Sequence, residues 1–152
     1  MKKKLILGLL ALVVAMQFIR PGKNKGTVEG PEDISHVVTV SPSVKTILAV
    51  ACNDCHSNHT NYPWYSEIMP FGWWLNHHVE EGKEHLNFSE FATYEKERQD
   101  HKLEEMEEEV KEHEMPLESY TWLHKEAKLT EEQTKALVEW VNQARLELKS
   151  KN

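Results

Sequence analysis

The stretch Cys52-Asn53-Asp54-Cys55-His56 contains both cysteines of the chain, with a histidine directly after the second one. A C-x-x-C-H string is the attachment pattern of c-type haem. Two thiols on one turn can each add to one vinyl group of the porphyrin. The imidazole that follows is then held beneath the ring, where it can bind the iron from the proximal side. The motif therefore predicts one haem c per chain, attached through Cys52 and Cys55, with His56 as an iron ligand.

Two other kinds of site also use this spacing. A redox dithiol uses C-x-x-C, but such dithiols sit beside a βαβ pattern that the sequence lacks. The thiols could instead form half of a zinc site, to which His56 or His59 would add ligands. A structural zinc site usually takes a second ligand pair, and there is no second cysteine pair. Haem is favoured further by the signs of export described below, because c-type attachment takes place outside the cytoplasm.

The second axial position of the iron decides what such a haem can do. Met115-Pro116 lies between two expected helices, so a loop stiffened by Pro116 could carry the Met115 thioether across the distal face. Ligation by His56 and Met115 would suit electron transfer. Met115 could also simply pack in the core, and the distal position could be open. Other candidate ligands are His77, His78, His85, Met69 and Met106.

A cluster of aromatic residues follows the motif, and it includes Trp64 and Tyr65. These two side chains could form a wall of the haem pocket and donate hydrogen bonds to a propionate. They could equally belong to the core of a small helical domain. We take Trp64 and Tyr65 as candidate cofactor-binding residues.

The sequence from Ser41 onward predicts an all-α domain, because apolar residues recur at helical spacing and no alternating strand pattern occurs. We expect helices near residues 42–51, 71–85 and 90–113, the third of them ended by Pro116, and a last helix after Thr130. Ser41-Pro42 is a typical helix start, and Thr130 with Gln133 forms a capping box. The expected core face of the last helix consists of Leu137, Trp140, Val141, Ala144 and Leu148.

The N-terminus has the pattern of an export signal or signal-anchor, with three lysines before an apolar run from Leu5 to Ile19. Fifteen residues of helix span roughly 22 Å, against ~30 Å for a hydrocarbon core, and snorkelling lysines make up part of the difference. We predict an uncleaved hydrophobic anchor helix within 1–20, its basic end in the cytoplasm, and a flexible tether over 21–40. The haem-binding domain, 41–150, would then lie on the periplasmic face of the inner membrane.

Length and composition limit the alternatives. A chain of 152 residues is about one domain, and two cysteines rule out a disulfide-stapled scaffold. With 18 Lys and Arg against 25 Asp and Glu, the net charge is −7, which argues against nucleic-acid binding. The acidic run over 104–114 is either solvated surface or a docking patch for a partner.

The tract CNDCHSNHTNYPWYSEIMP, residues 52–70, resembles the small monohaem haem-binding domain proteins of c-type cytochrome character. The resemblance continues through HVEEG at 78–82, LNFS at 86–89 and MPL at 115–117, and spans roughly 44–141. It implies a cytochrome c-like helical domain around one covalent haem c on Cys52 and Cys55, with His56 proximal. By similarity to class I cytochromes c, Met115 is the distal ligand. Phe91 departs from the family pattern, which has Trp there.

These patterns together predict an electron carrier that exchanges single electrons with redox partner proteins of the envelope. No acid/base pair or nucleophile arrangement indicates catalysis, so we do not expect an enzyme. A haem-based sensor or ligand binder, or a peroxidase-like protein, would need an open distal site.

Overall fold

The computed structural model describes residues 2–151 of the chain. The α-helices are α1 (Lys2–Met16), α2 (Pro42–Ala51), α3 (Asn53–His56), α4 (Phe71–His85), α5 (Lys96–Lys111), α6 (Glu118–Thr121) and α7 (Glu131–Ser150). Four 3-10 helices join them, namely η1 (Ile34–His36), η2 (Trp64–Glu67), η3 (Phe88–Thr93) and η4 (Lys125–Ala127). The part of the chain so described contains no β-strand, and one isolated antiparallel bridge joins Lys25 to His59. The all-α prediction is confirmed.

Two of the expected helix starts, those of α2 and α7, are found where the capping residues placed them. The Ser41 hydroxyl accepts a hydrogen bond from the Val44 amide at 3.3 Å, which caps α2. Thr130 and Gln133 form the reciprocal capping box of α7, and the five residues expected on its core face are buried. Helix α4 also has the predicted bounds, Phe71–His85.

The third predicted helix, 90–113, is wrong at its start. The Asn87 side chain accepts a hydrogen bond from the Ser89 amide and caps η3, which is a separate 3-10 helix. Helix α5 therefore begins at Lys96 and ends at Lys111. Its end comes before Pro116, because His113 adopts a left-handed conformation with φ of 61° and stops the helix.

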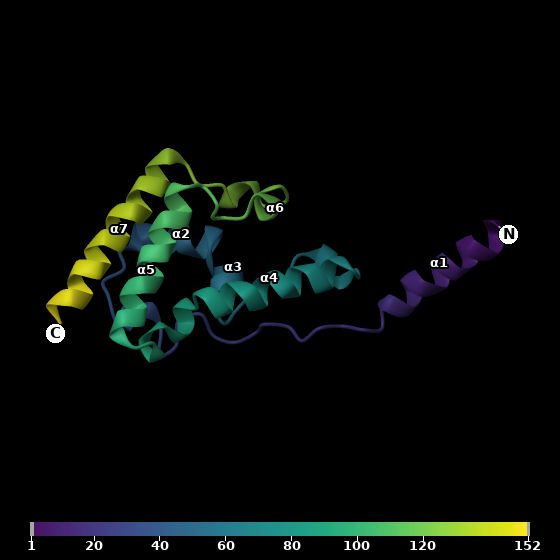
Figure 1. Ribbon diagram of the computed structural model, residues 1–152, viewed down its shortest axis with the longest axis horizontal. Coiled ribbons are helices and arrows are strands. Elements are labelled where there is room, and N and C mark those ends of the chain that lie inside the picture. The colour runs from purple at the N-terminus through teal and green to yellow at the C-terminus, as the bar shows by residue number, and fades with distance from the viewer. Residues whose placement is uncertain (1, 152) are drawn as a thin grey trace.

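The core lies between α5 and α7, which run side by side (Figure 1), with α2 packed against α7. Leu103 of α5 and Leu137 of α7 are completely buried there. Ion pairs hold the same two helices together at the surface, since Arg145 of α7 donates to Asp100 at 2.8 Å and to Glu104 at 2.8 Å.

Residues 24–40, for which we expected part of a flexible tether, instead pack on the domain. Ile34 and Val38 are only 3% and 2% exposed and belong to the core. The Gly26 amide donates to the Asn58 carbonyl at 2.6 Å, and a Cβ on Gly26 would lie 2.8 Å from the same oxygen. The glycines and charged residues of this segment indicated a flexible linker. The burial of Ile34 and Val38 was not predicted, because it depends on residues far along the chain.

Helix α1 forms where an apolar N-terminal helix was predicted, and none of its residues is buried. It projects from the end of the molecule opposite α7 (Figure 1). Among residues 2–151 no helix combines the length and apolar character needed to cross a membrane. The predicted N-terminal helix is present as α1.

Candidate functional site

The CNDCH motif follows α2 directly: Cys52 lies between the two helices, and Asn53–His56 form the single-turn helix α3. We call Cys52–His56 the attachment turn. The Cys55 and His56 amides both donate to the Cys52 carbonyl, at 3.1 and 3.0 Å. This turn places two thiols and one imidazole on a single helical step, as the motif predicted. All three side chains are half-buried, and no disulfide joins the two cysteines.

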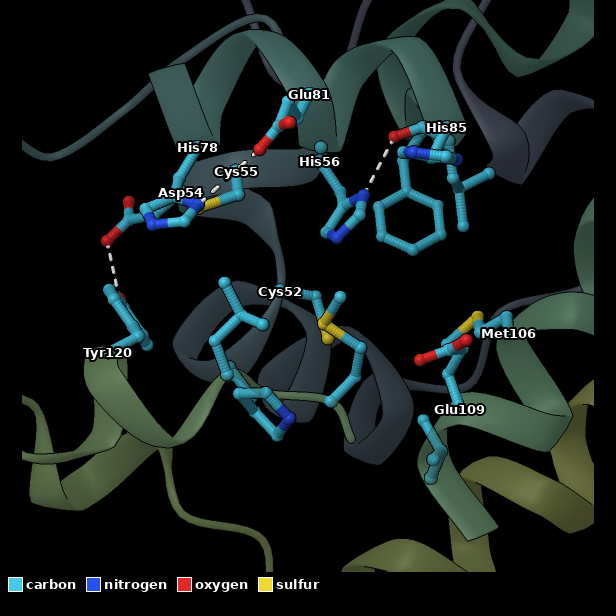
Figure 2. Close-up of a pocket in the computed structure, with 18 of the residues that line it drawn as sticks. Cys52, Asp54, Cys55, His56, His78, Glu81, His85, Met106, Glu109 and Tyr120 are labelled. Atoms are coloured by element: carbon cyan, nitrogen blue, oxygen red, sulfur yellow. Dashed lines mark hydrogen bonds and ion pairs between the residues drawn. The ribbon is translucent and has the colours of Figure 1, made fainter. Parts of the chain in front are cut away.

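A backbone contact fixes the orientation of His56. Its Nδ1–H donates to the Leu86 carbonyl at 2.9 Å, and its ring centroid lies 6.2 Å from that of Phe88. Because a carbonyl can only accept, this bond fixes the tautomer and leaves Nε2 with a free lone pair. Figure 2 shows that nitrogen pointing into a cavity. Burial lowers the pKa of His56, which favours the neutral ring that binds metals.

Helix α4 approaches the motif closely because residue 82 is a glycine. A Cβ on Gly82 would lie 2.8 Å from the Cys55 carbonyl oxygen and 3.0 Å from the Cys55 Cβ. The chain after this helix supplies Leu86 to His56. Gly82 thus allows α4 to cover one side of the attachment turn.

The motif lines a cavity of about 480 Å³, within the usual size range of cofactor sites. Cys52, Cys55 and His56 lie on one side of it, and α5 with the segment after it forms much of the remainder. The apolar residues of that second wall are Met106, Val110, Met115, Pro116, Leu117 and Leu129. Two thiols, a free imidazole nitrogen and an apolar wall around one cavity are the groups that a covalent haem requires, so these residues fit it.

The chain after α5 turns back so that Met115 reaches this cavity. The Glu114 and Met115 amides both donate to the Glu109 carbonyl, at 3.0 and 3.2 Å, and His113 supplies the left-handed residue of the turn. Met115 is half-buried and lines the same cavity as His56. The structure thereby brings together two residues 59 positions apart that the sequence had paired as candidate iron ligands.

The other candidate ligands divide into two groups. His78, His85 and Met106 also line the cavity. His77 and Met69 do not, because His77 points outward beside Glu81 and Met69 packs against the start of α4. Of the candidate distal ligands, only those that line the cavity remain: Met115, His78, His85 and Met106.

Trp64 and Tyr65 do not line the cavity, contrary to the role predicted for them. Trp64 is 77% exposed, because η2 turns it away from the domain. The Tyr65 hydroxyl hydrogen-bonds His124 Nε2 at 2.9 Å instead.

Tyr120, which the sequence analysis did not propose as a site residue, lines the cavity beside Asp54 of the motif. Its hydroxyl donates to Asp54 Oδ2 at 2.8 Å, and its ring stacks on His124 at 4.4 Å (Figure 2 shows the bond to Asp54). Burial, followed by the bond to Asp54, raises the pKa of Tyr120 well above its usual value. This bond ties the attachment turn to the segment that carries Met115.

Lys102 is a second residue that the sequence analysis missed. It lies on the buried side of α5 and lines the cavity, with Nζ donating to the His85 carbonyl and lying 5.1 Å from the centre of the Tyr94 ring. Burial lowers the pKa of this amine. The sequence could have indicated its burial, because Lys102 lies three or four residues from Gln99 and Met106 and so shares the buried face of α5 with them and with Leu103.

The alternatives to haem attachment gain little from the geometry. Burial raises the pKa of Cys52 to about 12 and that of Cys55 to about 11, whereas redox-active dithiols have a lowered thiol pKa. Within residues 2–151 no group of three or more His, Cys, Asp or Glu side chains is placed to hold a metal ion.

Comparison with known proteins gives one match. The family model described as a haem-binding domain matches residues 11–143, which is most of the chain. Neither the curated proteins nor the solved structures contain a match. The match covers the attachment turn, both walls of the cavity and most of α7, and the chain therefore belongs to the haem-binding domain family.

Proposed function

We propose that this haem-binding chain carries one haem c, attached through Cys52 and Cys55, and acts as a single-electron carrier. His56 would be the proximal iron ligand and Met115 the distal one. The observation that carries the proposal is that all four residues line one cavity. When bound, the haem supplies an iron that alternates between ferrous and ferric states, and a closed His/Met site keeps both ligands in place.

The protein's own residues would hold and insulate this centre. The Leu86 carbonyl keeps Nε2 of His56 available by holding its Nδ1–H. Gly82 lets α4 cover the attachment turn, and the apolar residues of the second wall, which include Val110, would pack against the porphyrin.

The location and partners of this carrier are also part of the proposal. A basic start followed by the apolar helix α1, exposed on all sides, supports export and attachment to the periplasmic face of a membrane. The redox partners would be other envelope proteins. The exposed acidic residues of α5 are a candidate docking surface, for which association rates would fall with added salt.

The test is an optical spectrum of the full chain, made in cells that mature c-type haem and recorded oxidised and reduced. Haem staining that survives denaturing electrophoresis would report covalent attachment. An absorption band from sulfur-to-iron charge transfer would report a methionine ligand in the oxidised protein.

Two conservative variants identify the distal ligand. Met115→Leu and Met106→Leu both keep the apolar volume of a side chain that lines the cavity, but only the first removes the proposed ligand. We expect the band to disappear in Met115→Leu and to persist in Met106→Leu. The reverse result would move the ligand to Met106.

Binding of carbon monoxide to the ferrous protein tests whether the distal side is closed. Slow or absent binding in the wild type and ready binding in Met115→Leu is the expected result. Ready binding in both would contradict the carrier and favour a sensor or peroxidase-like protein. The absence of covalent haem from the wild type would contradict the attachment itself.

A further inference from the structure

An exposed aromatic surface lies at the start of α4, far from the cavity wall formed by α5. It consists of Trp64, Ile68, Phe71 and Trp74, which we call the aromatic patch; Trp64 is 77% and Phe71 57% exposed. Phe71 and Trp74 are three residues apart on α4 and so share a face. Helix η2, which carries Trp64, packs on α4, and Ile68 follows η2 with its carbonyl accepting from the Gly72 amide at 3.1 Å, so all four residues belong to the same end of α4. Large apolar side chains gathered in this way mark a contact surface.

The C-terminal end of α1 is fixed beside the aromatic patch. The Gln17 side-chain amide exchanges two hydrogen bonds with the Met69 backbone, at 3.0 and 3.1 Å. The Trp73 indole N–H donates to the Ile19 carbonyl at 2.7 Å, and Arg20 pairs with Glu67 at 2.6 Å. Figure 1 shows α1 leaving the molecule at this end of α4. Whatever surrounds the end of α1 therefore also meets the patch.

The chemistry of α1 indicates what surrounds it. Its side chains from Leu5 to Val14 are apolar and exposed on every side of the helix, and Phe18 and Ile19 continue this surface toward the patch. A helix that is apolar all round needs an apolar environment on all sides. Aromatic rings are favoured where such an environment meets water, because one edge can stay hydrated.

The distribution of charge also favours a lipid surface at the end of the molecule that carries α1 and the aromatic patch. The acidic helix α5 lies at the end of the long axis opposite α1 (Figure 1). Beside the patch, the Glu67 carboxylate is paired with both Arg20 and Lys23. An anionic lipid surface would therefore meet a carboxylate outnumbered by two cations, on a protein whose net charge is −7.

We infer that the aromatic patch lies in the headgroup region of a lipid bilayer, beside the point where α1 enters it. The bilayer would thus hold the domain at two adjoining places, the apolar helix and the patch. The inference rests on the membrane attachment of α1 proposed above and is independent of haem. It requires α1 to enter lipid but does not require it to span.

The experiment uses the full chain labelled with 5-fluorotryptophan, one copy per nanodisc of phosphatidylethanolamine and phosphatidylglycerol. Fluorine NMR spectra are compared with and without lipids that carry a headgroup spin label. Each signal is assigned by a Trp→Phe substitution. Taking the ratio of the two spectra for each signal cancels effects of the haem iron.

We expect the Trp64 and Trp74 signals to lose intensity by about threefold or more with the spin label, as for rings at headgroup depth. Trp140 is the internal control, because it is buried in α7 at the far end of the molecule, and its signal should be unchanged. Equal ratios for Trp64, Trp74 and Trp140 in discs that hold the chain would overturn the inference.

Two other outcomes would also overturn it, and neither concerns the haem. Chain that separates from the discs would show that α1 does not enter lipid. Protection of Trp64 from the label in discs with one copy, together with shifts of its signal in discs with two, would assign the patch to a second copy. The haem spectrum of the same samples tests the attachment of haem separately.

Discussion

Replacing Gly82 with alanine tests whether the attachment turn depends on the close approach of α4. Gly82 lies inside that helix, where alanine is the better helix former by about 1 kcal/mol. Helix propensity alone therefore predicts that Gly82→Ala stabilises the protein. The tertiary contact predicts the opposite, because the new methyl group would lie 2.8 Å from the Cys55 carbonyl oxygen and 3.0 Å from its Cβ.

The steric cost exceeds the gain in helix propensity. Overpacking of a close-packed site costs about 1–3 kcal/mol, and the upper end applies here because the nearest atom belongs to the backbone of a turn and cannot rotate away. A cost of about 3 kcal/mol, less the gain of about 1, leaves a net loss of about 2 kcal/mol in the free energy of unfolding. For a chain of this length, that loss lowers the Tm by about 4–8 °C.

The assay is thermal unfolding followed by circular dichroism, with the yield of covalent haem as a second readout. Gly30→Ala is the control, because nothing lies within 4 Å of the Cβ it would add. It should unfold at or slightly above the wild-type temperature. A Gly82→Ala protein with an unchanged or raised Tm would refute the reasoning that α4 must touch the attachment turn.

Two further predictions concern side-chain pairs, Tyr120 with Asp54 and Arg145 with Asp100. Tyr120→Phe removes the hydroxyl that donates to Asp54 and should cost about 1.5–3 kcal/mol of stability, typical of a hydrogen bond to a charged group. It should also weaken the sulfur-to-iron band, because the Met115 segment loses its tie to the motif; a full-strength band would contradict this role. Arg145→Gln should destabilise the protein near pH 6, since the Arg145 guanidinium holds the pKa of Asp100 below its ordinary value of 3.8. A carboxylate with a lowered folded pKa stabilises above its unfolded pKa, so the difference between the two proteins in urea unfolding should shrink below pH 3.8, and a constant difference would refute the pairing.

Local patterns in the chain were enough to predict most of the helices and to name candidate attachment residues. The C-x-x-C-H spacing depends on one turn of backbone, so Cys52, Cys55 and His56 could be assigned without any tertiary contact. The capping box at Thr130 and the apolar face of α7 are local in the same way, and both are confirmed. A cap and an apolar helix face depend on residues three or four positions apart, so both can be predicted from the sequence alone.

Features that depend on distant contacts could not be predicted in this way. Trp64 and Tyr65 were misplaced because the direction of η2 is set by its packing on α4 rather than by its own residues. The burial of Ile34 and Val38 likewise needs partners far along the chain.

The meeting of His56 and Met115 around one cavity, and the position of Tyr120 in its wall, belong to the tertiary structure as well. Met115-Pro116 could be recognised in the sequence, but its place depends on how α5 ends and where the chain turns afterwards. Local patterns therefore named the residues that we propose to attach and ligate a haem. Long-range packing determined which other side chains surround them, because a cavity is formed by several elements at once and is encoded by none of them alone.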